Sequence, residues 1–197
     1  RRSRGGADVP AALSSYLERG GAIVFYGATM QERGTMGETG GVVEWYQRLP
    51  VAELQPIIGW RFRTAEEAAT VRAADEKGLR EGWHRAPADD REWRAIKVPA
   101  AWEDELGRPL DGWGWYRARF RLPEAARGST VVLSLGRIDD NDWTYVNGVE
   151  IGSTRGWDRL RYYEIAPGSP AYATLRFGGE NDIAVRVLDE GGAGGML

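Results

Sequence analysis

The stretch Ile138–Asp158, IDDNDWTYVNGVEIGSTRGWD, decides the fold class. Asn147-Gly148 lies at its centre, between two runs in which hydrophobic and polar residues alternate. Asn-Gly between such runs is the strongest short-range signal for a β-hairpin, because a type I′ turn requires positive φ at both central residues. The stretch therefore predicts two antiparallel strands joined by a two-residue turn.

The chain from residue 57 onwards contains further short segments that predict strands. Each is rich in β-branched and aromatic residues and is bounded by Gly, Pro or Asp. Short strands separated by turn residues are typical of an antiparallel β-sandwich or jelly roll. We therefore expect this mainly-β fold, with the hairpin and with strands over Ile57–Arg63, Arg94–Val98, Asp111–Pro123, Val131–Leu135, Arg161–Ile165 and Asp182–Leu188.

Two of these strands show an alternation that predicts which face is buried. In Asp182–Leu188, every second residue is a branched apolar one, so Ile183, Val185 and Val187 are expected to point inward. In Asp111–Pro123, one face is apolar and the other carries Trp115, Arg117, Arg119 and Arg121. That second face predicts a strand that is half solvated.

The segments between the strands predict one helix, one loop and one tail. Thr64 and Glu67 form a capping box, and the helix is expected to run to Gly78, a suitable C′ residue. We expect a loop over residues 102–107 and a flexible tail over residues 191–197, GGAGGML.

The first 56 residues have a different pattern. Residues 8–20 have a cap, an apolar stripe and a closing glycine, which predict a helix. The continuous apolar run over residues 22–26 is typical of a buried parallel strand. We interpret residues 1–56 as an α/β segment, either the tail of a preceding domain or an extension packed on the sandwich of residues 57–197. The chain starts without Met and without a signal-peptide pattern, and we expect it to be cut from something longer.

Composition excludes several classes of protein. The net charge of −3 is not the basic footprint of a nucleic-acid-binding protein, and no apolar run approaches the about 20 residues of a membrane span. The absence of Cys fits either the cytoplasm or a secreted fold of this size, and of these we favour a secreted or periplasmic location. The 9 Trp residues fit core packing or platforms for a ligand ring.

No constellation of residues in the sequence predicts catalysis. There is no G-x-S-x-G nucleophile elbow, no phosphate-binding loop and only one histidine, His84, which we expect in a surface or packing role. The cluster Asp139, Asp140 and Asp142 has two interpretations. Its oxygens could bind a structural calcium ion, or its side chains could form turns by bonding their own backbone.

Five residues at expected loop edges are candidates for sugar binding. Trp113 and Trp157 lie beside glycines, so their rings are expected to be exposed for stacking on a sugar. Asp111, Asp158 and Arg161 could bond neighbouring hydroxyls. In the alternative interpretation, Trp157 covers one end of the sandwich and Arg161 pairs with Asp158.

Six motifs, in this order, resemble the N-terminal sugar-binding domain of family 2 glycoside hydrolases. The same galactose-binding-like jelly roll also occurs in sialate O-acetylesterases. The resemblance covers residues 57–195. It rests on Asp111-Gly-x-Gly-Trp-Tyr-Arg, Phe120-x-Leu-Pro, Leu135-Gly-x-Ile-Asp-Asp, Tyr145-Val-Asn-Gly-x-x-Ile-Gly, Arg161-x-Tyr and Glu180-Asn-x-Ile-Ala-Val-Arg-Val.

The resemblance implies a domain that is not itself the catalyst, because the two catalytic glutamates of family 2 enzymes lie on a separate barrel. It also implies that Asp189, just after the last strand, leans toward the pocket of that barrel. Here the following segment is shortened to Gly191–Gly195, a departure from the family. Galactose-binding-like domains often hold a structural calcium, which supports the cation interpretation above. Residues 1–56 loosely resemble the end of a flavodoxin-like or amidotransferase-like domain.

Two functions follow from these expectations. The first is an accessory carbohydrate-recognition domain of a glycosidase or carbohydrate esterase, with carbohydrate and a catalytic domain as its partners. The second is a structural module that docks a catalytic barrel or another subunit and binds no sugar. Exposure of Trp113 and Trp157 on a polar-rimmed surface would favour recognition, and burial under an apolar patch would favour docking.

Overall fold

The computed structural model describes residues 23–27, 52–64, 77–87 and 89–197, and the structural statements below concern these residues. The expected helix over residues 8–20 lies outside them, and so does most of the helix expected after Thr64. Within the described part of the chain, no helix has the length and apolar character needed to cross a bilayer.

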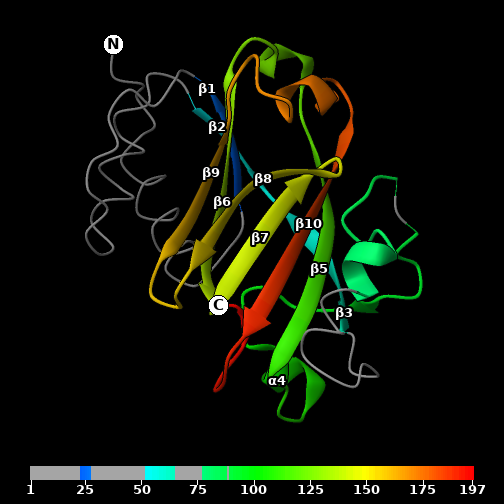
Figure 1. Ribbon diagram of the computed structural model, residues 1–197. Coiled ribbons are helices and arrows are strands. Elements are labelled where there is room, and N and C mark those ends of the chain that lie inside the picture. Colours follow the sequence, from blue (N-terminus) through cyan, green and yellow to red (C-terminus); the bar gives the residue numbers. More distant parts are fainter. Residues whose placement is uncertain (1–22, 28–51, 65–76, 88) are drawn as a thin grey trace.

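Two antiparallel sheets pack face to face as a β-sandwich (Figure 1). The six-stranded sheet has the order β4-β3-β5-β10-β7-β8. Its strands are β3 (Ile58–Thr64), β4 (Arg94–Ala95), β5 (Gly112–Arg121), β7 (Asn141–Val146), β8 (Val149–Arg155) and β10 (Glu180–Asp189). The five-stranded sheet is built on β6, and its strands are β1 (Ile23–Gly27), β2 (Ala52–Pro56), β6 (Thr130–Asp139), β9 (Leu160–Ile165) and β11 (Gly195–Met196).

The core between the sheets confirms the predicted inward face of β10. Ile183, Val185 and Val187 are completely buried, and they belong to the same cluster as Leu133 and Leu135 of β6. β-Branched and γ-branched side chains at every second position fill the space between two sheets about 10 Å apart. The expected antiparallel β-sandwich is therefore the fold of the described chain.

The Asn147-Gly148 hairpin is confirmed in its turn as well as in its strands. Asn147 has φ 47° and Gly148 has φ 86°, and the turn joins β7 to β8. The side chain of Asn147 also reaches the neighbouring loop, where its Oδ1 accepts the N–H of Asp182 and its Nδ2 donates to Asn181 Oδ1. The turn residue thus fixes the start of β10 as well as the hairpin.

The strand expected over residues 22–26 exists as β1, but it is not parallel to its neighbours. β1 pairs antiparallel with β2 on one side and with β6 on the other. A continuous apolar run indicates burial of both faces and carries no information on strand direction. β1 and β2 therefore contribute to the sandwich, while the boundary at residue 56 stays a prediction for the rest of the N-terminal segment.

The expectation that one face of β5 is exposed to solvent was wrong for half of the strand. Trp115 and Arg117 have no exposed surface, and only Arg119 and Arg121 reach solvent. Residues 77–87 and 89–93 cover this outer face, and together with the sheet they form a second apolar cluster, which consists of Trp83, Trp93, Trp113, Trp115, Tyr145 and Ala184. Arg117 donates to the carbonyl oxygens of Trp83 and Arg85, so the buried guanidinium joins this covering segment to β5 of the sheet.

The helix that leads into this cover ends four residues later than expected. Trp83 N–H donates to Gly78 O and Gly82 N–H donates to Leu79 O, which is the Schellman arrangement with Gly82 at C′. Gly82 has φ +71°, as this position requires. Gly78 is needed for packing and not for the helix end. A Cβ at this position would lie 2.5 Å from Trp115 Nε1.

Three other local expectations also differ from the structure. Residues 102–106 form a short helix, α4 (Trp102–Leu106), and the strand expected over Arg94–Val98 is reduced to β4. The expected flexible tail is docked, since β11 pairs with the end of β6 and Met196 is completely buried. Glycine favours this docking: a Cβ on Gly194 would lie 2.4 Å from the Trp102 ring.

Candidate functional site

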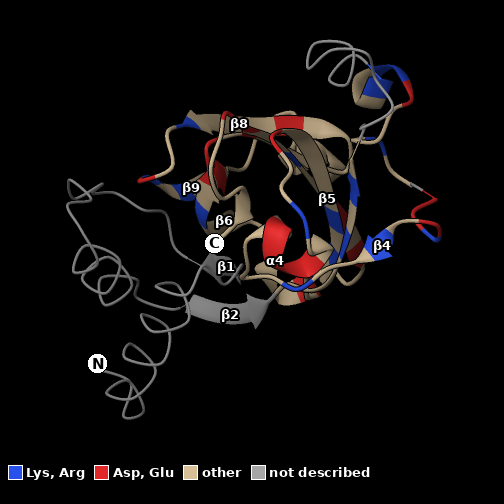
Figure 2. Ribbon diagram, turned by 90° about the horizontal axis from the view of Figure 1, so that it is seen from below, with Lys and Arg blue, Asp and Glu red and all other residues tan. Residues whose placement is uncertain are grey.

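One end of the sandwich gathers most of the residues expected to have a function. In the register of the six-stranded sheet, Leu188 lies opposite Asn141 and Asp189 opposite Gly112. The corner between β6 and β7, the end of β10 and the start of β5 are therefore neighbours. We call this the acidic end, and Figure 2 views the molecule from that side. Its carboxylates include Glu103, Asp111, Asp139, Asp140, Asp158, Asp189 and Glu190.

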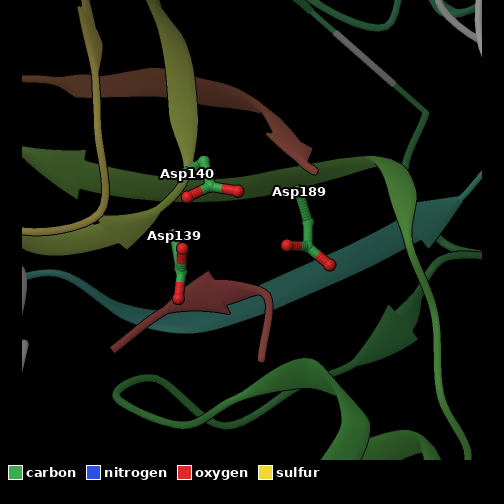
Figure 3. Close-up of side chains that lie close together, drawn as sticks. All are labelled: Asp139, Asp140 and Asp189. Atoms are coloured by element: carbon green, nitrogen blue, oxygen red, sulfur yellow. The ribbon is translucent and has the colours of Figure 1, made fainter. Parts of the chain in front are cut away.

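Three of these side chains form a compact group (Figure 3). Asp139, Asp140 and Asp189 each present a carboxylate oxygen, and these oxygens lie within 4.8 Å of one another. We call this group the Asp triad. Backbone amides orient two of its members: Glu190 N–H donates to Asp140 Oδ2 over 2.9 Å, and Gly191 N–H donates to Asp189 Oδ1 over 3.1 Å. Asp189 is 1 % exposed, and its Oδ2 has no hydrogen-bond partner among the described residues.

Burial and repulsion from neighbouring carboxylates raise the pKa of two members of the triad, Asp139 and Asp189. Burial, then the hydrogen bond and charge of Asp140, raise the pKa of Asp139 to about 7. Burial is also the main cause that raises the pKa of Asp189 to about 6, with the charges of Asp111, Glu103 and Asp140 adding to it. Near neutral pH the charged forms of Asp139 and Asp189 are therefore disfavoured, unless a proton or a cation compensates them.

Asp142, which the sequence grouped with Asp139 and Asp140, is not part of the triad. Its Oδ1 accepts Arg161 Nε–H over 2.9 Å, and its Oδ2 accepts the hydroxyls of Tyr163 and Thr144. Both Asp142 and Arg161 are completely buried. With its acceptors occupied by protein donors, Asp142 has a structural role, and Asp189 takes its place beside Asp139 and Asp140.

Arg161 is likewise a structural residue and not an accessible sugar ligand. Besides its pair with Asp142, it donates from Nη2 to Asp140 O over 2.7 Å and from Nη1 to Gly156 O over 2.9 Å. The alternative expectation that it pairs with Asp158 is also wrong. Arg161 instead holds the β6–β7 corner and the loop after β8 in place.

The two tryptophans expected on the surface differ. Trp157 is 61 % exposed, and the adjacent Asp158 is exposed as well. Gly156 N–H donates to Asn141 Oδ1, which places this loop beside the β6–β7 corner, at the acidic end. Trp157 is thus confirmed as an exposed ring.

Trp113 is not exposed. It lies within β5, is 8 % exposed and packs against Trp143, with the Arg186 guanidinium 4.1 Å from its ring centre. Its glycine neighbours suggested a loop. Gly114 is needed for a different reason, because a Cβ there would lie 2.2 Å from the Trp102 ring. A glycine inside a strand can mark a close approach of another side chain.

Sequence reasoning missed Glu103 and missed the association of Asp189 with the aspartates of the β6–β7 corner. Glu103 Oε2 accepts Gly194 N–H over 3.0 Å, which joins α4 to the loop between β10 and β11. The acidic run that follows Trp102 in the sequence could have drawn attention to Glu103. The association of Asp189 with Asp139 and Asp140 had no local signal in the sequence. About 50 residues separate Asp189 from the other two aspartates, and only strand register brings them together.

The triad carboxylates lie close enough together to share one ligand. The one histidine, His84, packs on the other cluster, against Trp115 and Tyr145. Close carboxylates suit a cation or hydroxyl donors.

The fold and this end define an antiparallel β-sandwich domain, and comparison with known proteins relates it to one group of enzymes. No family model matches the sequence. A β-glucuronidase of Paenibacillus borealis is 29 % identical over 109 residues, which are 53 % of this chain and 17 % of that protein.

Solved structures give the same relation. A β-glucuronidase of Ruminococcus gnavus has a TM-score of 0.54 at 23 % identity, over 68 % of this chain and 21 % of that one. A glycosyl hydrolase family 2 member from Bacteroides cellulosilyticus has a TM-score of 0.53 at 25 % identity, over 70 % and 18 %. The chain is thus related to a domain of family 2 glycoside hydrolases, and it spans about a fifth of their length.

Proposed function

We propose that this chain is a non-catalytic carbohydrate-recognition domain of a larger glycoside hydrolase, of the β-galactosidase or β-glucuronidase type, or of a carbohydrate esterase. The relatives are glycosidases several times longer than the region they share with this chain, which supports a catalytic domain as its partner. The sandwich would then be of the galactose-binding-like jelly-roll type. Its acidic end is the surface that faces carbohydrate.

The observation that carries this proposal is the convergence of Trp157, Asp158, Asp111 and Asp189 on that end. Trp157 presents an exposed flat ring, on which the C–H face of a sugar can stack. Asp158 and Asp111 are exposed carboxylates that can accept hydrogen bonds from sugar hydroxyls. Asp189 lies deeper, and Arg161 supports the site from below by holding the loop after β8.

A structural docking module is the second candidate, and one observation favours it. Ile58 of β3 is 71 % exposed, and it and Trp157 are the exposed large hydrophobic residues of the described chain. A neighbouring domain that covered either side chain would remove its apolar surface from water, which favours association. In this case Trp157 would pack against protein and not against sugar.

Tryptophan fluorescence distinguishes the two functions. The purified chain is titrated with galactosides, glucuronides and xylosides, and the Trp157→Ala and Trp157→Phe variants are titrated in parallel. A saturable signal that Trp157→Ala abolishes and a calorimetric binding constant that Trp157→Phe largely retains would support stacking at this ring. The Ile58→Ala variant is the matched control and should bind as the unmodified chain does.

A flat response to every sugar in the panel would contradict the recognition proposal. The docking function would then be tested by adding the separately expressed catalytic domain. Loss of that association in Trp157→Ala or Ile58→Ala would support docking through that residue, whereas undiminished association in both variants would reject both residues as contacts with the catalytic domain.

A further inference from the structure

The Asp triad has a feature that an ordinary acidic surface cluster lacks. Asp189 is only 1 % exposed, and its Oδ2 has no hydrogen-bond partner in the described part of the chain. A buried carboxylate oxygen without a donor costs free energy, so an unmet partner is expected at this position. Figure 3 shows the side chain of Asp189 directed toward the other two carboxylates.

Protein cations do not supply that partner. Among the described residues, no Lys or Arg forms an ion pair with Asp139, Asp140 or Asp189. Arg161 touches the corner only through the backbone carbonyl of Asp140, and its charge is already paired with Asp142. Three carboxylates therefore face one another without a compensating side chain.

The donor set selects the kind of ligand that fits. Three carboxylate oxygens, with no nitrogen or sulfur among them, are ligands for a hard cation. Ligands on opposite sides of Ca²⁺ lie about 5 Å apart and those of Mg²⁺ about 4 Å apart. The triad oxygens lie within 4.8 Å of one another, which is inside the span of a calcium coordination shell.

We propose that Asp139, Asp140 and Asp189 bind a calcium ion, with water completing its coordination. This site differs from the one the sequence suggested, because Asp189 replaces Asp142. It shares Asp189 with the proposed sugar surface, but it uses neither Trp157 nor Asp158. The ion neutralises the buried acidic group and joins the β6–β7 corner to the end of β10.

The position of the triad gives the ion a structural consequence. The amides of Glu190 and Gly191, which bond the triad carboxylates, begin the loop that leads to β11. β11 in turn pairs with Ile138 and Asp139 at the end of β6. Calcium would therefore stabilise the docked C-terminal segment as well as the two strand ends.

Isothermal titration calorimetry of the chelator-treated full chain with CaCl₂ and with MgCl₂ tests the site, and thermal unfolding is followed in parallel. We expect one Ca²⁺ per chain, weaker binding of Mg²⁺ and a rise in melting temperature with Ca²⁺ concentration. Asp189→Asn keeps the size of the side chain and relieves repulsion, so it should fold, yet its Ca²⁺ affinity should fall about tenfold or more because a charged ligand is lost. Asp139→Asn should behave in the same way.

The Asp158→Asn variant is the matched control, since it removes an exposed carboxylate from the same end of the sandwich. It should bind Ca²⁺ as the unmodified chain does. The proposal is overturned if the unmodified chain binds no Ca²⁺ at millimolar concentration, if Mg²⁺ binds more tightly, or if Asp158→Asn weakens binding as much as Asp189→Asn. Sugar titrations of Asp139→Asn without calcium separate this site from the proposed carbohydrate surface, because Asp139 belongs to the triad and not to that surface.

Discussion

Arg161 Nε lies 2.9 Å from Asp142 Oδ1, and neither side chain has any exposed surface. The pair joins β9 of one sheet to β7 of the other. Tyr163 and Thr144 complete the hydrogen bonds of the carboxylate. This buried and fully hydrogen-bonded ion pair holds Arg161 in place. Arg161 in turn bonds the loop of Trp157 through Gly156 O and the corner of the Asp triad through Asp140 O.

Removal of one partner of this pair should destabilise the fold strongly. We expect Asp142→Asn to lower the free energy of unfolding by about 3–5 kcal/mol, because the guanidinium of Arg161 would remain buried without a counter-charge. Urea denaturation followed by fluorescence measures the change. The control is Asp89→Asn, which removes an equally close but exposed pair with Arg91 and should change stability little. Equal losses in both variants would show that burial does not decide the effect.

His84 should make stability depend on pH. Burial first, then the charges of Arg85, Arg117 and Arg186, lower its pKa below the ordinary 6.5, and its Nδ1 has no hydrogen-bond partner in the described chain. The unfolded state therefore binds a proton at a higher pH than the folded state does. This contribution to stability is complete above about pH 6.5 and is lost as the pH falls toward the lower folded pKa.

The measurement is the free energy of unfolding from pH 7.5 to 5.5, for the unmodified chain and for His84→Gln. The difference between the two isolates the histidine from the buried carboxylates, whose raised pKa values act in the opposite direction over this range. We expect that difference to shrink as the pH falls. A difference that stays constant with pH would mean that His84 titrates normally in the folded chain.

Gly114 should not tolerate a side chain. A Cβ there would lie 2.2 Å from Trp102 Cζ3 and 2.6 Å from Phe62 Cε2, so Gly114→Ala should cost about 1–3 kcal/mol through overpacking. Gly179→Ala is the control, because the nearest atom to its added Cβ is 3.4 Å away. Thermal unfolding compares the two. A Gly114→Ala variant as stable as Gly179→Ala would contradict the packing of α4 against β5.

Met196 should contribute to stability although it is the penultimate residue. Its side chain is completely buried and belongs to the main core, so Met196→Ala should cost about 2–5 kcal/mol. Leu197→Ala, at a partly exposed neighbour, should cost less. Denaturant unfolding checks both variants. Equal and small effects would favour the flexible tail that the run of glycines suggested.

Local patterns in the sequence predicted the parts of the fold that depend on local conformation. The hairpin follows from the positive φ that Asn147 and Gly148 accept, and the inward face of β10 follows from alternation at Ile183, Val185 and Val187. The exposure of Trp157 beside a loop glycine was also predictable. Each of these depends on neighbours within a few positions along the chain.

The sequence by itself thus determined an antiparallel β-sandwich, its principal hairpin and one exposed aromatic ring at its end. Only the tertiary structure decided that the segment around Trp83 and Trp93 buries Trp115 and Arg117, that Asp142 pairs with Arg161, and that Asp189 joins Asp139 and Asp140. The reason is that these contacts join segments about 20–50 residues apart. Their partners are selected by strand register and by which segment covers which face, and neither leaves a signature in the residues next to each position.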